Sequence, residues 1–170
     1  MGFESTDHVL DTLLRAGPNW VLNIGGSFDP PHQLHLQIAE AGFKQLLNRL
    51  LGICKTADDL VAQAKHLIIV FMPAKQNTLK STLVVEPKLR FQMMQALLTH
   101  YKFEKKLQAL FLKMLSKRFP DLSSATAEQI VKNCLCIHVA TYETNRTAPS
   151  YTVDTCCTYR EYETINYLSF

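Results

Sequence analysis

Three short runs of apolar residues stand out along the chain. They are WVLNI (20–24), HLIIVFM (66–72) and CLCIHVA (134–140). Each run is apolar throughout instead of alternating with polar residues, which is typical of strands that are buried on both faces of a parallel sheet. We therefore predict three buried, parallel strands.

The segments between these runs have apolar residues at helical spacing. We predict a helix beginning near Leu34 and another over residues 87–100. The second is expected to have Leu89, Met93, Ala96 and Leu97 on its apolar face. A short helix capped near Ser5 to Asp7 is expected to stop at Gly17-Pro18, and a further helix is expected between Thr152 and Tyr162. Strands that alternate with helices predict an α/β fold, namely a Rossmann-like parallel sheet with flanking helices in a single domain spanning residues 1–170.

Residues 102–133 interrupt this alternation. KFEKKLQALFLKMLSKRFP has apolar residues at 103, 107, 110, 111, 114 and 115 with lysines opposite, and SSATAEQIVKN follows Pro120. We predict two helices that form a helical insertion and pack their apolar faces on the rest of the domain. The alternative is a basic helix that binds a partner or a membrane surface.

Composition and charge restrict the classes of function. The net charge of +3 is too small to indicate a nucleic-acid partner, but it suits an anionic small molecule. No apolar run reaches the roughly 18 residues that a membrane helix needs, and Glu4 and Asp7 argue against a signal peptide. The five cysteines are odd in number and lack CxxC spacing. We expect reduced thiols in a cytoplasmic protein, with no membrane partner and no metal-ligating cluster.

The most informative stretch is GGSFDPPHQLHL (25–36) at the end of the first predicted strand. The glycine pair lets backbone N–H groups approach a ligand, and the helix that follows offers unpaired N–H groups to phosphate. His32 and His35 are three apart at that helix start, so their rings can share one face. An imidazole pair there can donate hydrogen bonds to a polyphosphate. The alternative is a simple turn, with structural histidines and with Asp29 holding the turn through its side chain.

This stretch resembles the GG[ST]FDPxHxGHL signature of the nucleotidyltransferase superfamily, in which two histidines hold the phosphates of ATP. Four further segments resemble motifs of the bacterial-type nicotinate-nucleotide adenylyltransferase family, in the same order. These are Pro73-Ala74 with Lys80, Leu89-Arg90 with Met93 or Met94, Glu143 with Arg146, and PSYTVDT (149–155), which matches residue for residue. PSYTVDT indicates the pyridine-nucleotide branch.

The resemblance implies an adenylyltransferase of NAD biosynthesis with the nucleotidyltransferase fold. It assigns an ATP-binding set and catalytic residues, namely Gly25, Gly26, Ser27, Phe28, His32 and His35 for ATP, and His32, His35 and Lys80 for catalysis. Ser150, Tyr151, Thr152 and Asp154 fall in the segment that implies a mononucleotide pocket, although Tyr151 could also be a core residue. Mg²⁺ would accompany ATP, the second substrate would be nicotinate or nicotinamide mononucleotide, and a homo-oligomer is left open. Arg90 could equally be a solvated helix residue.

The chain departs from the family in three ways. Leu34 replaces the glycine between the histidines and is expected to crowd the base or ribose, which typically costs about 1–3 kcal/mol. The loop from 75 to 80 lacks the usual proline pair, so the reach of Lys80 is open. INYLSF (165–170) resembles the beginning of a fourth strand, whereas the family continues to a final helix with an ISS-x-x-R motif. We therefore expect a chain truncated at its C-terminus.

These departures keep other functions open. One alternative is a non-catalytic nucleotide-binding or interaction protein derived from the family. The other is a different nucleotidyltransferase of the superfamily, although PSYTVDT is not expected there.

Overall fold

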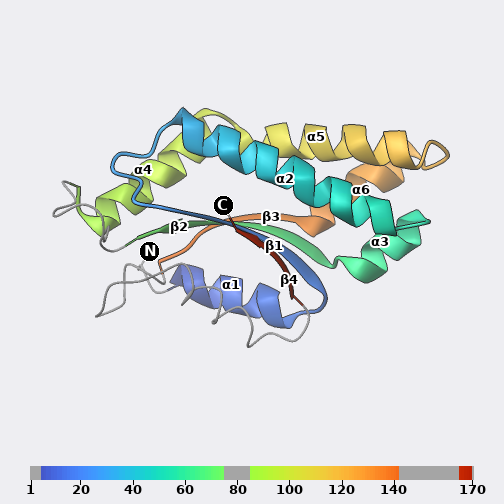
Figure 1. The fold of residues 1–170 in the computed structure, drawn as a ribbon, viewed down its shortest axis with the longest axis horizontal. Coiled ribbons are helices and arrows are strands. Elements are labelled where there is room, and N and C mark those ends of the chain that lie inside the picture. Colours follow the sequence, from blue (N-terminus) through green and yellow to red (C-terminus); the bar gives the residue numbers. More distant parts are fainter. Residues whose placement is uncertain (1–4, 75–84, 142–164, 170) are drawn as a thin grey trace.

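Four parallel strands form the sheet at the centre of the computed structural model (Figure 1). They are β1 (Asn19–Gly26), β2 (His66–Pro73), β3 (Leu135–Val139) and β4 (Ile165–Ser169). Their order across the sheet is β3-β2-β1-β4, and every neighbouring pair is parallel. The three predicted strands and the strand predicted at 165–170 are thus confirmed.

The structure describes residues 5–74, 85–141 and 165–169. Within these ranges six helices flank the sheet: α1 (Ser5–Arg15), α2 (Gln33–Ile53), α3 (Ala57–Gln63), α4 (Pro87–His100), α5 (Phe103–Arg118) and α6 (Ser124–Cys134). None of the helices in the described part of the chain is both long and apolar enough to cross a membrane. The predicted α/β class with a parallel sheet between helices is confirmed, and it is compatible with a Rossmann-like fold.

Both faces of the sheet are buried, which explains why the strands are apolar throughout. On one face, Leu22 and Ile24 pack with the apolar sides of α2, α4, α5 and α6 in the larger core. On the other face, Val21 and Val70 pack against Leu10 of α1. Figure 1 shows the same division, with α1 on one side of the sheet and the other helices opposite.

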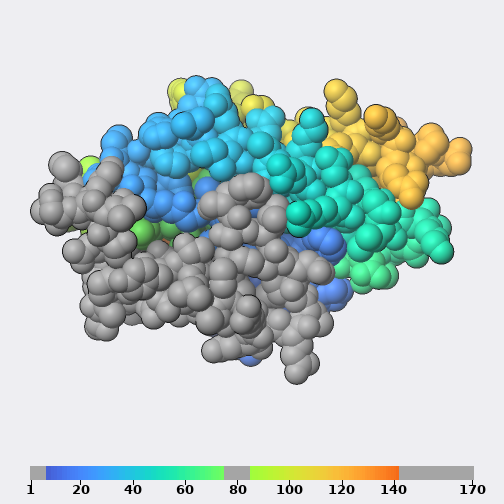
Figure 2. All heavy atoms as spheres, viewed as in Figure 1, coloured from blue at the N-terminus to red at the C-terminus, as the bar shows by residue number. Residues whose placement is uncertain are grey.

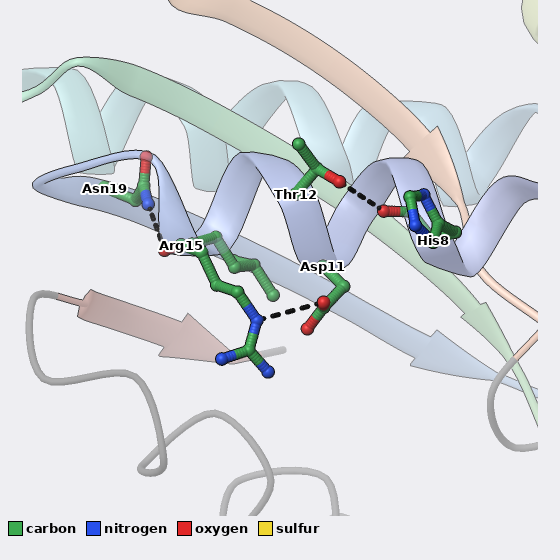
Figure 3. A network of polar contacts seen from close by, with 6 residues as sticks. His8, Asp11, Thr12, Arg15 and Asn19 are labelled. Atoms are coloured by element: carbon green, nitrogen blue, oxygen red, sulfur yellow. Dashed lines mark hydrogen bonds and ion pairs between the residues drawn. The ribbon is translucent and has the colours of Figure 1, made fainter.

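Helix α1 is held to the sheet at both ends. At its C-terminal end, Nδ2 of the buried Asn19 donates to the carbonyl oxygens of Leu13 and Leu14 at 3.1 and 2.9 Å. Figure 3 shows Asn19 beside this end of α1. Near its N-terminal end, Asp7 accepts hydrogen bonds from the Thr141 backbone N–H at 2.9 Å and from the Thr141 hydroxyl at 2.6 Å. The predicted helix that stops before Gly17-Pro18 is confirmed. Asp7, which was expected near its cap, lies in its first turn and bonds Thr141, just after β3.

The two helices predicted within residues 102–133 are confirmed as α5 and α6. The apolar side of α5 enters the larger core through Phe103, Leu107, Phe111 and Leu115, each at most 1% exposed. Leu110 and Met114, also predicted on that side, are half-buried. The prediction that the insertion packs its apolar faces against the sheet layer therefore agrees with the structure.

Sequence reasoning missed α3, a seven-residue helix in the connection from 54 to 65. Its signal is a capping box and not apolar periodicity. The Thr56 hydroxyl accepts from the Asp59 N–H at 3.1 Å, and the Asp59 carboxylate accepts from the Thr56 N–H at 2.9 Å. A Thr-x-x-Asp pair of this kind satisfies orphan donors at the first turn of a helix.

The apolar face predicted for α4 is wrong. Leu89 is 48% exposed, Ala96 is exposed, and Met93 and Leu97 are only partly buried. The buried face consists instead of Arg90, Phe91 and Met94. The prediction failed because a helical-periodicity count treats arginine as a solvent-facing residue, and Arg90 is fully buried.

Candidate functional site

The candidate site lies at the carboxyl end of β1. Ligands of open α/β sheets bind outside the carboxyl ends of the strands, where the strand order reverses direction. With the order β3-β2-β1-β4, this reversal falls between β1 and β4. Gly25 and Gly26 end β1, and α2 begins at Gln33. The fold therefore places the GGSFDPPHQLHL segment beside the expected crevice.

Gly25 has open space where a side chain would stand. A Cβ atom built on Gly25 would meet no atom of the described residues within 4 Å. A Cβ atom on Gly26 would come 3.5 Å from the Phe28 ring, which is ordinary van der Waals contact. Packing within the described part of the chain therefore does not require a glycine at position 25. Open space next to an exposed backbone is what the close approach of a ligand needs.

The two histidines lie against each other at the start of α2. His32 is the N-cap residue, and its backbone N–H donates to Nδ1 of His35 at 3.0 Å. The two ring centroids are 3.9 Å apart, with an angle of 30° between the ring planes. The prediction that the rings share one face is confirmed. His32 is exposed and His35 is half-buried, so both are accessible from the same side.

The surroundings of His35 favour its neutral form. Burial, together with the neighbouring His32 imidazole, lowers the pKa of His35 below its ordinary value of 6.5. His35 is therefore neutral at pH 7. Nδ1 of His35 lies 3.0 Å from the His32 backbone nitrogen and 3.2 Å from the His32 carbonyl oxygen, and the ring tautomer decides which of these contacts is the hydrogen bond. In the tautomer in which Nδ1 accepts from the His32 N–H, Nε2 carries the proton and is a donor beside the positive end of the helix dipole.

The Phe28 ring packs against the imidazole of His35. Its ring is fully buried, with its centroid 4.7 Å from that of His35 and 6.3 Å from that of Phe71. Its backbone is left-handed, with φ of 47°. The Phe28 side chain is thus part of the core, and what it offers to the predicted ATP site is the position of its backbone and the support of the His35 ring. Ser27, the residue before it, is half-buried.

Leu34 occupies the position between the histidines and is 55% exposed. It lies in the first turn of α2, directly after Gln33. The described residues thus leave more than half of its side chain open to solvent. Whether it crowds a bound base or ribose stays a prediction.

Arg90, which could equally have been a solvated helix residue from the sequence, is completely buried in the structure. Its Nη1 donates to the carbonyl oxygen of Ser27 at 2.5 Å and to that of Ala74 at 2.7 Å. Its Nε donates to the carbonyl oxygen of Val85 at 3.0 Å. Burial lowers the pKa of Arg90, and the nearby Asp29 opposes that shift. The suggestion that Arg90 is a solvated helix residue is wrong, because it joins the segments that follow β1 and β2 to the start of α4.

Two further contacts close the same corner. The Ala74 N–H donates to the Gly26 carbonyl oxygen at 2.8 Å, which joins the ends of β1 and β2. Oδ1 of Asp29 accepts from the Val85 N–H at 3.1 Å. The expectation that Asp29 accepts from backbone N–H groups agrees with this contact, whose donor lies 56 positions along the chain. That Asp29 also holds its own turn stays a prediction.

Several predicted site residues lie outside the described residues. They are Lys80, Glu143, Arg146, Ser150, Tyr151, Thr152 and Asp154, together with the helix predicted between 152 and 162. The structure therefore brings together Gly25, Gly26, Ser27, Phe28, His32 and His35 and leaves the remaining assignments as predictions.

The described part of the chain contains no group of three His, Cys, Asp or Glu side chains placed to hold a metal ion. Asp29, the acid nearest in sequence to the histidines, has Oδ1 engaged by Val85. Mg²⁺ commonly binds through substrate phosphates with only one or two carboxylates. The expectation that Mg²⁺ accompanies ATP stays a prediction.

Comparison of the sequence with the profiles of known protein families finds no match, and a search among curated proteins finds no similar sequence. The resemblance described above therefore rests on the motifs in the sequence.

Proposed function

We propose that this protein transfers the adenylyl group of ATP to nicotinate or nicotinamide mononucleotide, forming the dinucleotide and pyrophosphate. One observation carries the proposal. The two histidines lie ring to ring at the first turn of α2, next to an open glycine at the end of β1. A helix N-terminus with imidazole donors and an unobstructed backbone is suited to bind a polyphosphate.

The reaction is an in-line displacement at phosphorus. A 5′-phosphate oxygen of the mononucleotide forms a bond to the α-phosphorus of ATP, and the bond from that phosphorus to the α,β-bridging oxygen breaks. The electron pair of the broken bond leaves with pyrophosphate, so no covalent intermediate on the protein is needed. Catalysis of this kind depends mainly on positioning and on stabilising charge.

In this proposal His35 supplies a neutral Nε2–H donor to the oxygens that gain negative charge on pyrophosphate. Its orientation is already held before binding, because Nδ1 accepts from the His32 N–H and the ring rests on Phe28. His32, which is exposed, supplies a second donor from the same side. Preorganised donors are effective because they need no reorientation in the transition state.

The remaining roles follow from the resemblance. Lys80 would add a positive charge toward the phosphates, and residues 150–154 would line the mononucleotide pocket. A cytoplasmic location is part of the proposal, and it is supported by the free thiols of Cys54, Cys134 and Cys136.

The experiment is pyrophosphate release by the purified chain given ATP, Mg²⁺ and each of the two mononucleotides in parallel. The test variant carries His32→Ala and His35→Ala. The matched control carries His8→Ala and His100→Ala, two exposed histidines elsewhere on the surface. We expect turnover in the wild type and in the control, and its loss in the test variant. The ratio of the two wild-type rates identifies the preferred mononucleotide.

Two other outcomes would point elsewhere. ATP binding that depends on His32 and His35 without turnover would contradict the enzymatic proposal and leave a nucleotide-binding protein. The absence of ATP binding in calorimetry would contradict any nucleotide function at this site.

A further inference from the structure

Helices α2 and α5 lie side by side on the same side of the sheet and run in the same direction (Figure 1). Near the start of α5, Nζ of Lys106 lies 2.6 Å from Oε2 of Glu40. At the end of α5, Arg118 donates to the carbonyl oxygens of Leu51 and Cys54 at 3.1 and 2.7 Å. Figure 2 shows atoms of α2 exposed in the upper part of this view, with atoms of the helices behind it visible above and beside them.

A groove of about 490 Å³ lies between the second halves of the two helices. Its residues are of two kinds, basic and uncharged. They are Lys44, Lys113, Lys117 and Arg118, and Asn48, Leu51, Gly52, Leu110 and Met114. No acidic side chain of the described residues lines the groove. Glu40, an acidic residue of α2, pairs with Lys106 outside it.

The positive charge of the protein is concentrated in this layer. Helices α2 and α5 together carry seven basic and two acidic side chains, a net charge of +5. The whole chain has a net charge of only +3. The basic side chains are therefore enriched in α2 and α5 relative to the rest of the chain.

Helix dipoles do not account for all of these charges. Lys117 and Arg118 are in the last turn of α5, where a positive charge stabilises the helix end. Lys44 and Lys113 lie in the middle of their helices, and the dipole effect falls off within the last turn. Holding like charges close together destabilises the free protein, and a negatively charged partner would remove that cost.

We propose that this groove binds an acidic amphipathic helix of a partner protein. Leu110 and Met114 line the groove and are only half-buried, so side chains that project from a third helix can reach this apolar floor. Carboxylates flanking the apolar face of that helix would meet Lys44 and Lys113 on the two walls. A flat bilayer surface fits less well, because it calls for apolar side chains that protrude, and the apolar side chains of this groove are recessed.

The groove is separate from the candidate active site. At 1.5 Å per residue, Lys44 lies about 14 Å and Gly52 about 25 Å along α2 from His35. The inference therefore does not depend on the proposed adenylyl transfer.

The test is fluorescence anisotropy of a labelled synthetic helical peptide with leucines on one face and glutamates on both flanks, at about 0.15 M salt. A peptide of the same composition in scrambled order is the control ligand. The test variant of the full chain carries Lys44→Glu and Lys113→Glu. The matched variant carries Lys88→Glu and Lys132→Glu, two exposed lysines on α4 and α6 with the same change in net charge.

We expect the amphipathic peptide to bind the wild type and the matched variant alike. The test variant should bind about tenfold more weakly or worse, which corresponds to a loss of about 1.4 kcal/mol. Circular dichroism should show that both variants are folded. Equal loss in the matched variant, or equal binding of the scrambled peptide, would overturn the proposal. The absence of peptide binding would also overturn it. If phosphatidylserine vesicles bind instead, and their binding is lost in the Lys44→Glu, Lys113→Glu variant, the groove binds a membrane surface and the proposal is again overturned.

Discussion

Replacing Arg90 tests whether its buried guanidinium stabilises the candidate site by joining the segments after β1 and β2 to the start of α4. The side chain is fully buried and, among the described residues, donates to the carbonyl oxygens of Ser27, Ala74 and Val85. Hydrogen bonds to charged groups contribute roughly 1.5–3 kcal/mol each. A change to methionine removes all three, but it also removes the several kcal/mol that burying a charge costs. We therefore expect Arg90→Met to lower the free energy of unfolding by about 3 kcal/mol.

Lysine at the same position should be worse than methionine. Arg90→Lys keeps a positive charge in the buried site but loses the guanidinium fork that reaches three carbonyl oxygens at once. A lysine that releases its proton to avoid the cost of burial also loses the charge-assisted hydrogen bonds. We expect a loss of about 4 kcal/mol or more for Arg90→Lys, because breaking a buried charge network leaves an uncompensated charge.

The measurement is urea unfolding followed by circular dichroism, with both variants and the wild type compared at pH 7. The order of stability should be wild type, then Arg90→Met, then Arg90→Lys. A lysine variant as stable as the wild type would refute the reasoning, since one ammonium group would then replace the fork. A methionine variant within about 0.5 kcal/mol of the wild type would equally do so, because that is the range of ordinary surface substitutions.

Three further predictions concern the core, the histidine pair and the joint between α1 and β3. Phe111→Ala should destabilise the protein by about 3–5 kcal/mol in thermal unfolding, because Phe111 is fully buried and packs at right angles to Phe43. His35 has a lowered pKa, so the unfolded chain binds more protons, and stability should fall as the pH drops below about 6.5. His35→Gln should flatten that dependence. Burial alone would raise the pKa of Asp7, but the nearby His138 imidazole and the hydrogen bonds from Thr141 lower it overall. Asp7→Asn should therefore cost about 1–3 kcal/mol at pH 7 and weaken the loss of stability below about pH 4.

Each of these predictions has an outcome that contradicts it. An unchanged melting temperature for Phe111→Ala would mean that α5 does not pack into the core. Equal slopes of stability against pH for the wild type and His35→Gln between pH 5 and 7 would assign that dependence to another group, of which His66 is a candidate because its pKa is lowered as well. A variant Asp7→Asn that is as stable as the wild type would show that Thr141 finds equivalent partners.

The strands and most helices could be predicted because their signals are local. A run such as HLIIVFM is apolar on both faces of a strand whatever surrounds it, and the apolar spacing along α5 repeats every three or four residues. The short helix α3 was missed because seven residues are too few to show a period, although its Thr-x-x-Asp capping box was present in the sequence.

In the candidate site, too, some features follow from a local sequence pattern and others do not. The spacing of three between His32 and His35 at a helix start brings their rings together, because an N-cap residue and the third residue of the helix lie beside each other. What their surroundings do to them is not local. The support of His35 by Phe28 and the lowered pKa of His35 depend on burial, which a linear pattern does not report.

The sequence by itself thus determined the α/β class, the parallel strands and the pairing of the two histidines, since each depends on residues a few positions apart. Only the tertiary structure decided that Arg90 is buried and not solvated. Its partner Ser27 is 63 positions away, and the carbonyl oxygens of Ser27, Ala74 and Val85 converge only after β1, β2 and α4 have packed together. A buried polar group is stable only where hydrogen-bond partners are within reach, and the whole fold determines whether they are.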